Sequence, residues 1–399
     1  MENYTHIENP FTARPLRGPQ TLESDYHTTA TESIDITQTI TNASLGDTSA
    51  QVALGIMYVK GQAANQDYQT AMDWFCKAAE KNDPAAQNEI GDLFRFGKGV
   101  PQDCLVAMKW YERAAVQDDP RAQFNIATLY DYGIGVSQDF RKAMLWYCKA
   151  AEKGYAPAQN SIGDLYANGQ GVTKDNATAQ EWYLKAAGQN YAEAEYRIGT
   201  MYREGRGYLP DESVALNWFN KAIEHGDING WGANSKGYIY LHGVGTPKDM
   251  EKAYGWFLKA ARQGNTFAQE DVGILYFIGN GTLTNYPEAM EWLIKAASQG
   301  LRESQRLVGL MYHRGLGVPQ NLSVALQWFQ KSAERGLHNA QFELGQAYYV
   351  GEGVAKNLQT AKFWLRKAAE QGHERAQSYL QQIDHEENLS SKFAGVAMK

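Results

Sequence analysis

Small and apolar residues recur along most of this chain at the spacing of one face of an α-helix. In residues 86–94 they stand at positions 86, 90, 91, 93 and 94, and in residues 107–115 at 107, 110, 114 and 115. Residues spaced in this way line one side of a helix. The stretch from Gly97 to Pro101 separates the two segments, and glycine and proline favour turns. The pattern predicts two amphipathic helices joined by a tight turn.

The same helix–turn–helix pattern repeats along the chain with a period of 36 residues. Nine of the ten tryptophans keep this spacing, except for one step of 38 residues: Trp74, Trp110, Trp146, Trp182, Trp218, Trp256, Trp292, Trp328 and Trp364. A series of small residues runs in parallel: Gly55, Gly91, Ala127, Gly163, Gly199, Gly237, Gly273, Gly309 and Gly345. A fixed period of this length is typical of stacked helical repeats.

Individual positions of the repeat have structural roles. Asp103 and its equivalents precede the second helix, where an aspartate caps the helix N-terminus. The glycine lets a neighbouring helix approach closely, and tryptophan is expected to fill the wedge between successive helix pairs. Because each pair alone leaves an apolar face open, stability requires stacking. We therefore predict an all-α fold, a right-handed α/α superhelical solenoid of about nine 36-residue helix–turn–helix repeats plus a capping half-repeat.

The repeat can be written A-x-x-x-(L/I)-G-x-(L/M)-(Y/F)-x-x-G-x-G, followed by D-x-x-x-A-x-x-W-(Y/F/L)-x-(K/R)-(A/S)-(A/I). This pattern resembles the Sel1-like repeat family, a relative of the tetratricopeptide repeats, over residues 50 to about 384. The resemblance implies an adaptor or scaffold role, since known members assemble signalling, degradation or cell-wall complexes. The chain lacks the two cysteines per repeat of the Cys-rich bacterial branch, and the signal peptide and membrane anchor of the endoplasmic-reticulum branch.

The two ends of the chain differ from the repeats. Residues 1–48 hold ten threonines, two arginines and seven acidic residues, with no tryptophan and no periodicity. We expect a disordered, acidic, Thr-rich tail over residues 1–48, the Sel1-like solenoid over residues 49–384, and a flexible C-terminal tail over residues 385–399. The acidic N-terminal tail is also a candidate for intramolecular contact with the array.

Charge and cysteine content narrow the function classes. The formal net charge is −7, whereas nucleic-acid binders normally present a basic face, so we expect no nucleic-acid partner. No run of 18 apolar residues occurs and the N-terminus has no signal-peptide pattern, so we expect a cytoplasmic protein with no membrane insertion. The odd number of cysteines, Cys76, Cys104 and Cys148, favours a reducing compartment.

Motifs that carry chemistry are not found. The sequence has no H-x-x-x-H or C-x-x-C pair for zinc, no G-x-S-x-G and no kinase signature. Eight glycine pairs such as Gly97 and Gly99 recur with the repeat, each after a helix, so we interpret them as turns and not as phosphate loops. The sequence therefore predicts no catalytic residues, no metal and no cofactor, and we do not expect an enzyme.

The inner surface of the array is the candidate binding site. Four positions on each first helix, set by tetratricopeptide geometry, vary in type between repeats, and their aromatic, Asn and Arg side chains suit peptide recognition. The candidates in this concave groove are Asn88, Arg95, Asn160, Asp164, Tyr196, Arg203, Asn234, Tyr238, Arg306, His313, Arg314, Phe342 and Tyr349. The alternative is an ordinary solvated groove without a ligand.

In the C-terminal half of the groove, basic and aromatic candidates come together. Arg306, His313 and Arg314 share nearly one helix face, and Phe342 and Tyr349 follow in the next repeat. This combination predicts acidic or carboxylate-bearing ligands.

One joint between repeats breaks the period. The segment Gly226 to Gly232 is two residues longer than its equivalents, and Trp231 is the only tryptophan out of register. Two alternatives follow. Either the insertion is neutral and Trp231 covers the gap, or Trp231 is an exposed joint anchor at a hinge between five N-terminal and four C-terminal repeats.

The function that the sequence favours is a protein–protein interaction scaffold or adaptor that binds partner segments in the concave groove. The alternative is a regulatory subunit or activator of a partner enzyme, of the kinase or cell-wall synthesis type. Either role requires protein partners, which the sequence does not identify.

Overall fold

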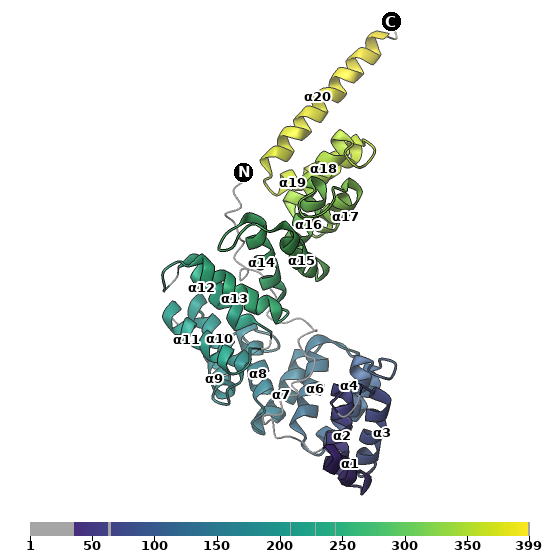
Figure 1. The fold of residues 1–399 in the computed structure, drawn as a ribbon, viewed down its shortest axis with the longest axis vertical. Coiled ribbons are helices and arrows are strands. Elements are labelled where there is room, and N and C mark those ends of the chain that lie inside the picture. Colours follow the sequence, from purple (N-terminus) through teal and green to yellow (C-terminus); the bar gives the residue numbers. More distant parts are fainter. Residues whose placement is uncertain (1–35, 63–64, 208, 228, 244, 398–399) are drawn as a thin grey trace. The chain divides into compact units, whose positions relative to one another are not determined.

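The computed structural model describes residues 36–62, 65–207, 209–227, 229–243 and 245–397. This part of the chain contains α-helices and no strand (Figure 1), which confirms the all-α prediction within it. The helices are Ile36–Ser44 (α1), Thr48–Lys60 (α2), Tyr68–Glu80 (α3), Pro84–Phe96 (α4), Cys104–Ala115 (α5), Pro120–Tyr132 (α6), Phe140–Glu152 (α7), Ala156–Asn168 (α8), Asn176–Ala187 (α9), Ala192–Glu204 (α10), Glu212–Glu224 (α11), Trp231–His242 (α12), Met250–Arg262 (α13), Thr266–Ile278 (α14), Tyr286–Ser298 (α15), Arg302–Arg314 (α16), Leu322–Glu334 (α17), His338–Val350 (α18), Leu358–Glu370 (α19) and Glu374–Ala397 (α20).

The helices are organised in pairs. From α2 with α3 to α18 with α19, the two helices of each of nine pairs pack more extensively on each other than on the neighbouring pair. The last helix, α20, packs on α19 and touches α18, as the predicted capping half-repeat would. The described chain divides into two compact units, one ending at Gly226 and the other beginning at Asp227. Each unit is a stack of helix pairs, the architecture of an α-helical solenoid.

The core of each repeat is filled by the residue after the tryptophan. Tyr183 is only 2% exposed, and a Cβ atom at Gly163 would lie 2.5 Å from its ring. Trp182 packs against the apolar cluster of the preceding repeat, which includes Tyr147, but stays half-buried, with the Lys185 ammonium 3.9 Å from its ring centre. The expectation that tryptophan fills the wedge is therefore only partly right. The small residue of the repeat is required by the neighbouring core side chain, which is an aromatic ring here and Leu293 or Leu365 in two other repeats.

Helix caps end the elements where the sequence predicts. The carboxylate of Asp175 accepts hydrogen bonds from the backbone N–H groups of Ala177 (2.9 Å) and Thr178 (3.2 Å) at the start of α9. Gly169 ends α8 in the left-handed conformation, with φ of 70°, which explains why a glycine stands there. These caps satisfy backbone groups that a helix end leaves without partners.

Acid is expected to destabilise the array through its aspartate caps. Hydrogen bonds from the hydroxyl and then the backbone N–H of Thr178 lower the pKa of Asp175, and comparable first-turn hydrogen bonds lower the pKa of Asp67, Asp211 and Asp249. A lowered folded-state pKa gives stability that is present above the ordinary pKa and is lost as the pH falls through the folded value. The urea concentration at the midpoint of unfolding should therefore decrease once the pH is below about 4.

The control is a variant in which these four aspartates are replaced by asparagine, which caps without titrating, as Asn285 does natively at α15. We expect its midpoint to depend less on pH over this range. An equal acid dependence in the variant and the wild type would show that the caps are not responsible.

Both ends of the array differ from the sequence prediction. Residues 36–44, placed in the disordered tail, form α1, whose Ala43 is buried and whose Ala43 carbonyl accepts a hydrogen bond from Gln51 (3.1 Å). Residues 1–35 lie outside the described part. At the other end, residues 385–397 are helical and continue α20. Lys362 of α19 forms an ion pair with Asp384 of this helix, at 2.7 Å, and Ile383 of the same helix is buried.

Candidate functional site

Most of the candidate groove residues are not on an open surface. Nine of them are buried: Asn88, Arg95, Asn160, Asp164, Tyr196, Asn234, Tyr238, Arg306 and Phe342. Arg203, His313 and Tyr349 are half-buried, and Arg314 is exposed. This placement differs from the accessible groove that tetratricopeptide geometry predicts. The main physical reason is that many of these side chains bond to the neighbouring repeat.

In the first unit, an asparagine network links two repeats. Asn125 of α6 donates a hydrogen bond to the side-chain oxygen of Asn88 on α4 (2.9 Å). The same Asn125 accepts a hydrogen bond from Arg95, also on α4 (3.2 Å). These buried polar groups satisfy one another, as buried polar groups must to avoid a large desolvation cost.

A buried charged network joins the next two repeats of this unit. The Asp164 carboxylate accepts a hydrogen bond from the Tyr183 hydroxyl (2.7 Å) and forms an ion pair with Arg197 of α10 (3.0 Å). Arg197 also pairs with Glu193 (2.9 Å). Burial lowers the pKa of Arg197, but the charges of Asp164 and Glu193 outweigh burial and raise it overall. The network is therefore a structural link between α8, α9 and α10.

The remaining candidates of the first unit are placed separately. Tyr196 packs beside Phe219, with ring centres 5.8 Å apart, and Arg203 pairs with Glu204 at 3.2 Å. Asn160 is buried on α8.

In the second unit, two candidates are again engaged by near neighbours. The Tyr238 hydroxyl donates to the Asp271 carboxylate of α14 (2.9 Å), and Arg306 pairs with Glu303 on its own helix (2.7 Å). Asn234 is buried on α12. Arg306 is therefore buried and paired in charge with Glu303, whereas Arg314, with which the sequence predicts it to share a basic face, is exposed.

The inserted joint is held by the second unit. The carboxylate of Asp227 accepts hydrogen bonds from the backbone N–H groups of Trp231 (2.8 Å) and Ala233 (3.0 Å) at the start of α12, and the Gln263 side chain donates to the Asp227 carbonyl (2.6 Å). The Trp231 ring is half-buried beside Phe267, with ring centres 5.6 Å apart. This placement favours the alternative in which Trp231 covers the inserted segment.

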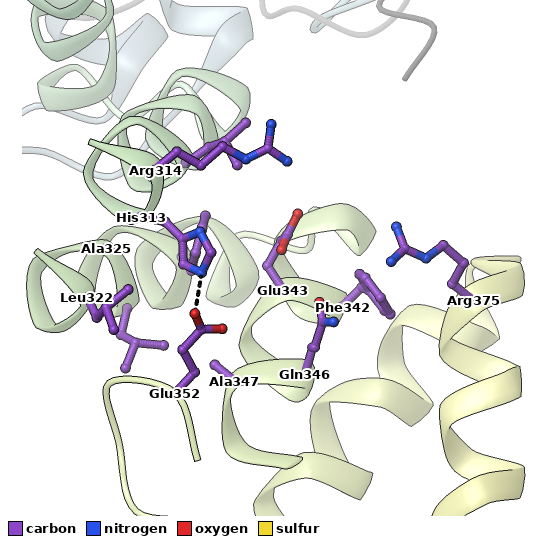
Figure 2. Close-up of a pocket in the computed structure, with 13 residues that line it drawn as sticks. His313, Arg314, Leu322, Ala325, Phe342, Glu343, Gln346, Ala347, Glu352 and Arg375 are labelled. Carbon is purple, nitrogen blue, oxygen red and sulfur yellow. Dashed lines mark ion pairs between the residues drawn. The ribbon is translucent and has the colours of Figure 1, made fainter. Parts of the chain in front are cut away.

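A pocket lies where three other candidates meet. His313 and Arg314 of α16 and Phe342 of α18 line a cavity of about 240 Å³ in the second unit (Figure 2). Its lining is completed by Leu310, Leu322, Ala325, Leu326, Phe329, Glu343, Gln346, Ala347, Glu352 and Arg375. Tyr349 is not among the lining residues; its hydroxyl donates to Glu386 of α20.

Charged side chains are distributed unevenly around this pocket. His313 pairs with Glu352 through its Nε2 atom at 3.2 Å, shown as a dashed line in Figure 2. Arg375 of α20 lies with its guanidinium 4.8 Å from the Phe342 ring centre. In Figure 2, Glu343 lies between Arg314 and Arg375. Arg314 forms no ion pair or hydrogen bond with any described residue.

Sequence reasoning missed several pocket residues because they lie outside the four inner positions of the first helices. Glu343 is one such residue of α18, Glu352 belongs to the turn after that helix, and Arg375 belongs to α20. The one signal available is Glu352, which stands between the turn glycines Gly351 and Gly353 and so marks a charged side chain at the end of the inner helix.

The described residues form no metal site: no group of three or more His, Cys, Asp or Glu side chains among them could hold a metal ion. Cys76, Cys104 and Cys148 are free thiols, and burial raises the pKa of Cys76 and Cys148. In the same part of the chain, no helix combines the length and the apolar character that crossing a membrane requires.

The repeats match a known family nine times. The Sel1 repeat matches residues 48–83, 84–119, 120–155, 156–191, 192–227, 233–265, 266–301, 302–337 and 338–373. The chain belongs to the Sel1 repeat family. Each Sel1 match spans one helix pair of the structure, and the step from residue 227 to residue 233 coincides with the inserted joint.

Solved structures agree with this assignment. A protective antigen of uropathogenic Escherichia coli that displays an SLR fold is 33% identical, with a TM-score of 0.52; the match covers 88% of this chain and 82% of that one. A Sel1 repeat protein from Oxalobacter formigenes is 31% identical, with a TM-score of 0.51, and the match covers 57% of this chain and 99% of that one. No curated protein matches the chain.

Proposed function

We propose that this Sel1 repeat protein is an interaction scaffold that binds a segment of a partner protein in the pocket between α16, α17, α18 and α20. Sel1 and tetratricopeptide-like repeat proteins generally act as protein-interaction scaffolds. The observation that carries the proposal is the pocket itself. It gathers charged, polar and apolar side chains from four packed helices, and concave sites of this kind are where ligands are usually bound.

The test is affinity capture with a variant in which the pocket is filled. In Gln346→Trp, an indole replaces a half-buried side chain of the pocket wall. Wild-type protein and the variant are compared for the proteins that they retain from an extract of the source organism, with Glu291→Trp, an exposed position on α15, as the matched control. We expect at least one partner to be lost only with Gln346→Trp. Identical sets of retained proteins would contradict the proposal.

The N-terminal segment is proposed to compete for the same partner site. Residues 1–35 carry six acidic and two arginine side chains, so the segment is an acidic candidate for intramolecular contact. Because α1 packs on α2, the informative deletion removes residues 1–35 and keeps α1. Deletion should raise the affinity for a captured partner, and the gain should shrink as salt is added. An unchanged affinity at low salt would contradict the proposal that residues 1–35 compete with the partner.

A further inference from the structure

We infer that Glu195 and His225 form a pH-dependent latch, which fixes the last turn of α11 to α10 while the histidine is protonated and loosens when the histidine loses its proton. The inference goes beyond the proposed function and concerns the end of the first unit, next to the inserted joint. Three observations carry it: the contact between the two side chains, the burial of Glu195, and the neutral pairs that stand at the same positions of other repeats.

The two side chains are in direct contact. The Nδ1 atom of His225 lies 2.8 Å from one carboxylate oxygen of Glu195 and 2.9 Å from the other. Glu195 belongs to α10 and is 1% exposed, whereas His225 is the residue at which α11 ends and has 30% of its side chain exposed. Gly226, which follows, is the last residue of the first unit. The contact therefore ties the end of this unit to the helix before it.

Four other repeats hold a pair of glutamines at these positions. The side-chain nitrogen of the later glutamine donates a hydrogen bond to the side-chain oxygen of the earlier one in Gln117 with Gln87 (2.9 Å), Gln189 with Gln159 (2.8 Å), Gln299 with Gln269 (2.8 Å) and Gln371 with Gln341 (2.8 Å). The members of each pair are 30 residues apart, as Glu195 and His225 are. Among the nine repeats of the sequence, only the repeat of Glu195 has ionisable side chains at both positions. An amide pair does not titrate, whereas this pair does.

A glutamate at position 195 also changes the link to the preceding repeat. The equivalent Gln159 and Gln269 donate from Nε2 to the carbonyl oxygens of Ala151 (3.4 Å) and Ala261 (3.3 Å), each eight residues earlier in the preceding helix. An ionised carboxylate has no hydrogen to donate, so Glu195 cannot make this bond. His225 is the one side chain among the described residues that forms a hydrogen bond with Glu195. The buried carboxylate therefore depends on the histidine.

The other charged groups around the pair do not replace the histidine. Those of α9, α10 and α11, which pack on one another, are Glu181, Lys185, Glu193, Arg197, Arg203, Glu204, Glu212, Lys221 and Glu224. None of them forms a hydrogen bond or ion pair with Glu195 or His225. Arg197, two residues after Glu195, is balanced by Glu193 and by Asp164 of α8. Asp227, two residues after His225, accepts hydrogen bonds from the backbone at the start of α12.

The direction of the pH effect follows from the two charges. Histidine ordinarily changes its charge between about pH 5 and pH 8. A protonated His225 balances the Glu195 carboxylate, whereas a neutral one leaves a buried negative charge without its cation. A histidine that gains an anionic partner on folding contributes stability that is present in acid and is lost as the pH rises through its titration. The last turn of α11 should therefore open more readily at pH 8 than at pH 6.

Hydrogen exchange of the full-length protein, followed by mass spectrometry, measures this opening. Peptides that cover residues 219–226 are compared at pH 6 and pH 8, with labelling times scaled for the intrinsic pH dependence of amide exchange. Because the imidazole is partly exposed and water screens its charge, we expect a loss of protection of about threefold at pH 8. Peptides that cover residues 293–300, which contain the neutral partner Gln299, should keep their protection.

Three variants show whether the pair is the cause. The double variant Glu195→Gln with His225→Gln restores the neutral pair of the other repeats and should abolish the pH dependence. Glu195→Gln alone keeps the histidine but removes the charge that it balances, and should abolish the pH dependence as well. His225→Gln alone should have, at pH 6, the lower protection that the wild type has at pH 8. Circular dichroism of each variant confirms that it is folded.

Two results would overturn the inference. One is equal protection of residues 219–226 in the wild type at the two pH values. The other is a pH dependence in Glu195→Gln that equals that of the wild type, because the carboxylate would then have no part in it. A threefold loss that is confined to the wild type and to residues near the pair would support the latch.

Discussion

Replacing Tyr183 with alanine is expected to lower the free energy of unfolding by about 3–5 kcal/mol. Tyr183 is 2% exposed, its ring fills the space above Gly163, and its hydroxyl donates to Asp164. The substitution leaves a cavity in the core of one repeat and removes a hydrogen-bond donor from a buried carboxylate. Chemical denaturation measures the loss, and hydrogen exchange should show that α8, α9 and α10 are destabilised first, because repeat arrays are stabilised by nearest neighbours.

The residues on either side of Tyr183 are matched controls. Trp182 is half-buried, so Trp182→Ala should destabilise less than Tyr183→Ala. Leu184 is 41% exposed, and Leu184→Ala should change stability by no more than about 0.5 kcal/mol. If Trp182→Ala were the most damaging of the three, the tryptophan and not its neighbour would be the core residue of the repeat.

Replacing Arg197 with methionine is expected to destabilise the protein by about 3–5 kcal/mol. Arg197 is 4% exposed and balances the charges of Asp164 and Glu193. Methionine retains much of the apolar stem but leaves Asp164 buried at 3% exposure without its cation. The midpoint of denaturation should fall clearly at pH 7, because a buried carboxylate is left without its counter-charge.

Two further variants separate charge from packing in this network. Lys185→Met removes an exposed lysine of the neighbouring helix and should have little effect. The double variant Arg197→Met with Asp164→Asn should recover part of the loss, because it removes the uncompensated charge. If the double variant lost more stability than the two single variants lose together, this role of Arg197 would be contradicted.

The repeat architecture could be predicted from sequence because every position of it recurs. The small residue at Gly163, the cap at Asp175 and the turn at Gly169 have local physical causes that appear nine times with little change. The core residue was harder to identify, since Trp182 and Tyr183 are adjacent and keep the same period. Only the packing on Gly163 distinguishes them.

The ends and the site depend on contacts that do not recur. Helix α1 has no tryptophan and no periodic pattern, although Gly46 and Asp47 occupy the cap positions that precede a first helix elsewhere. The burial of Asn88 follows from Asn125, 37 residues later, and such pairs cannot be read from a single sequence. The pocket gathers Arg375 from the capping helix, so its composition follows from how the repeats stack.

The central claim is that partners bind in the pocket between α16, α17, α18 and α20. Site-directed photo-cross-linking tests this claim most directly. A photo-reactive residue is placed at Gln346, which lines the pocket, or at Glu291, which is exposed on α15 away from it. Both proteins are irradiated with the same captured partner. We expect a discrete cross-linked species from position 346 and none from position 291. Cross-linking from position 291 alone would contradict it.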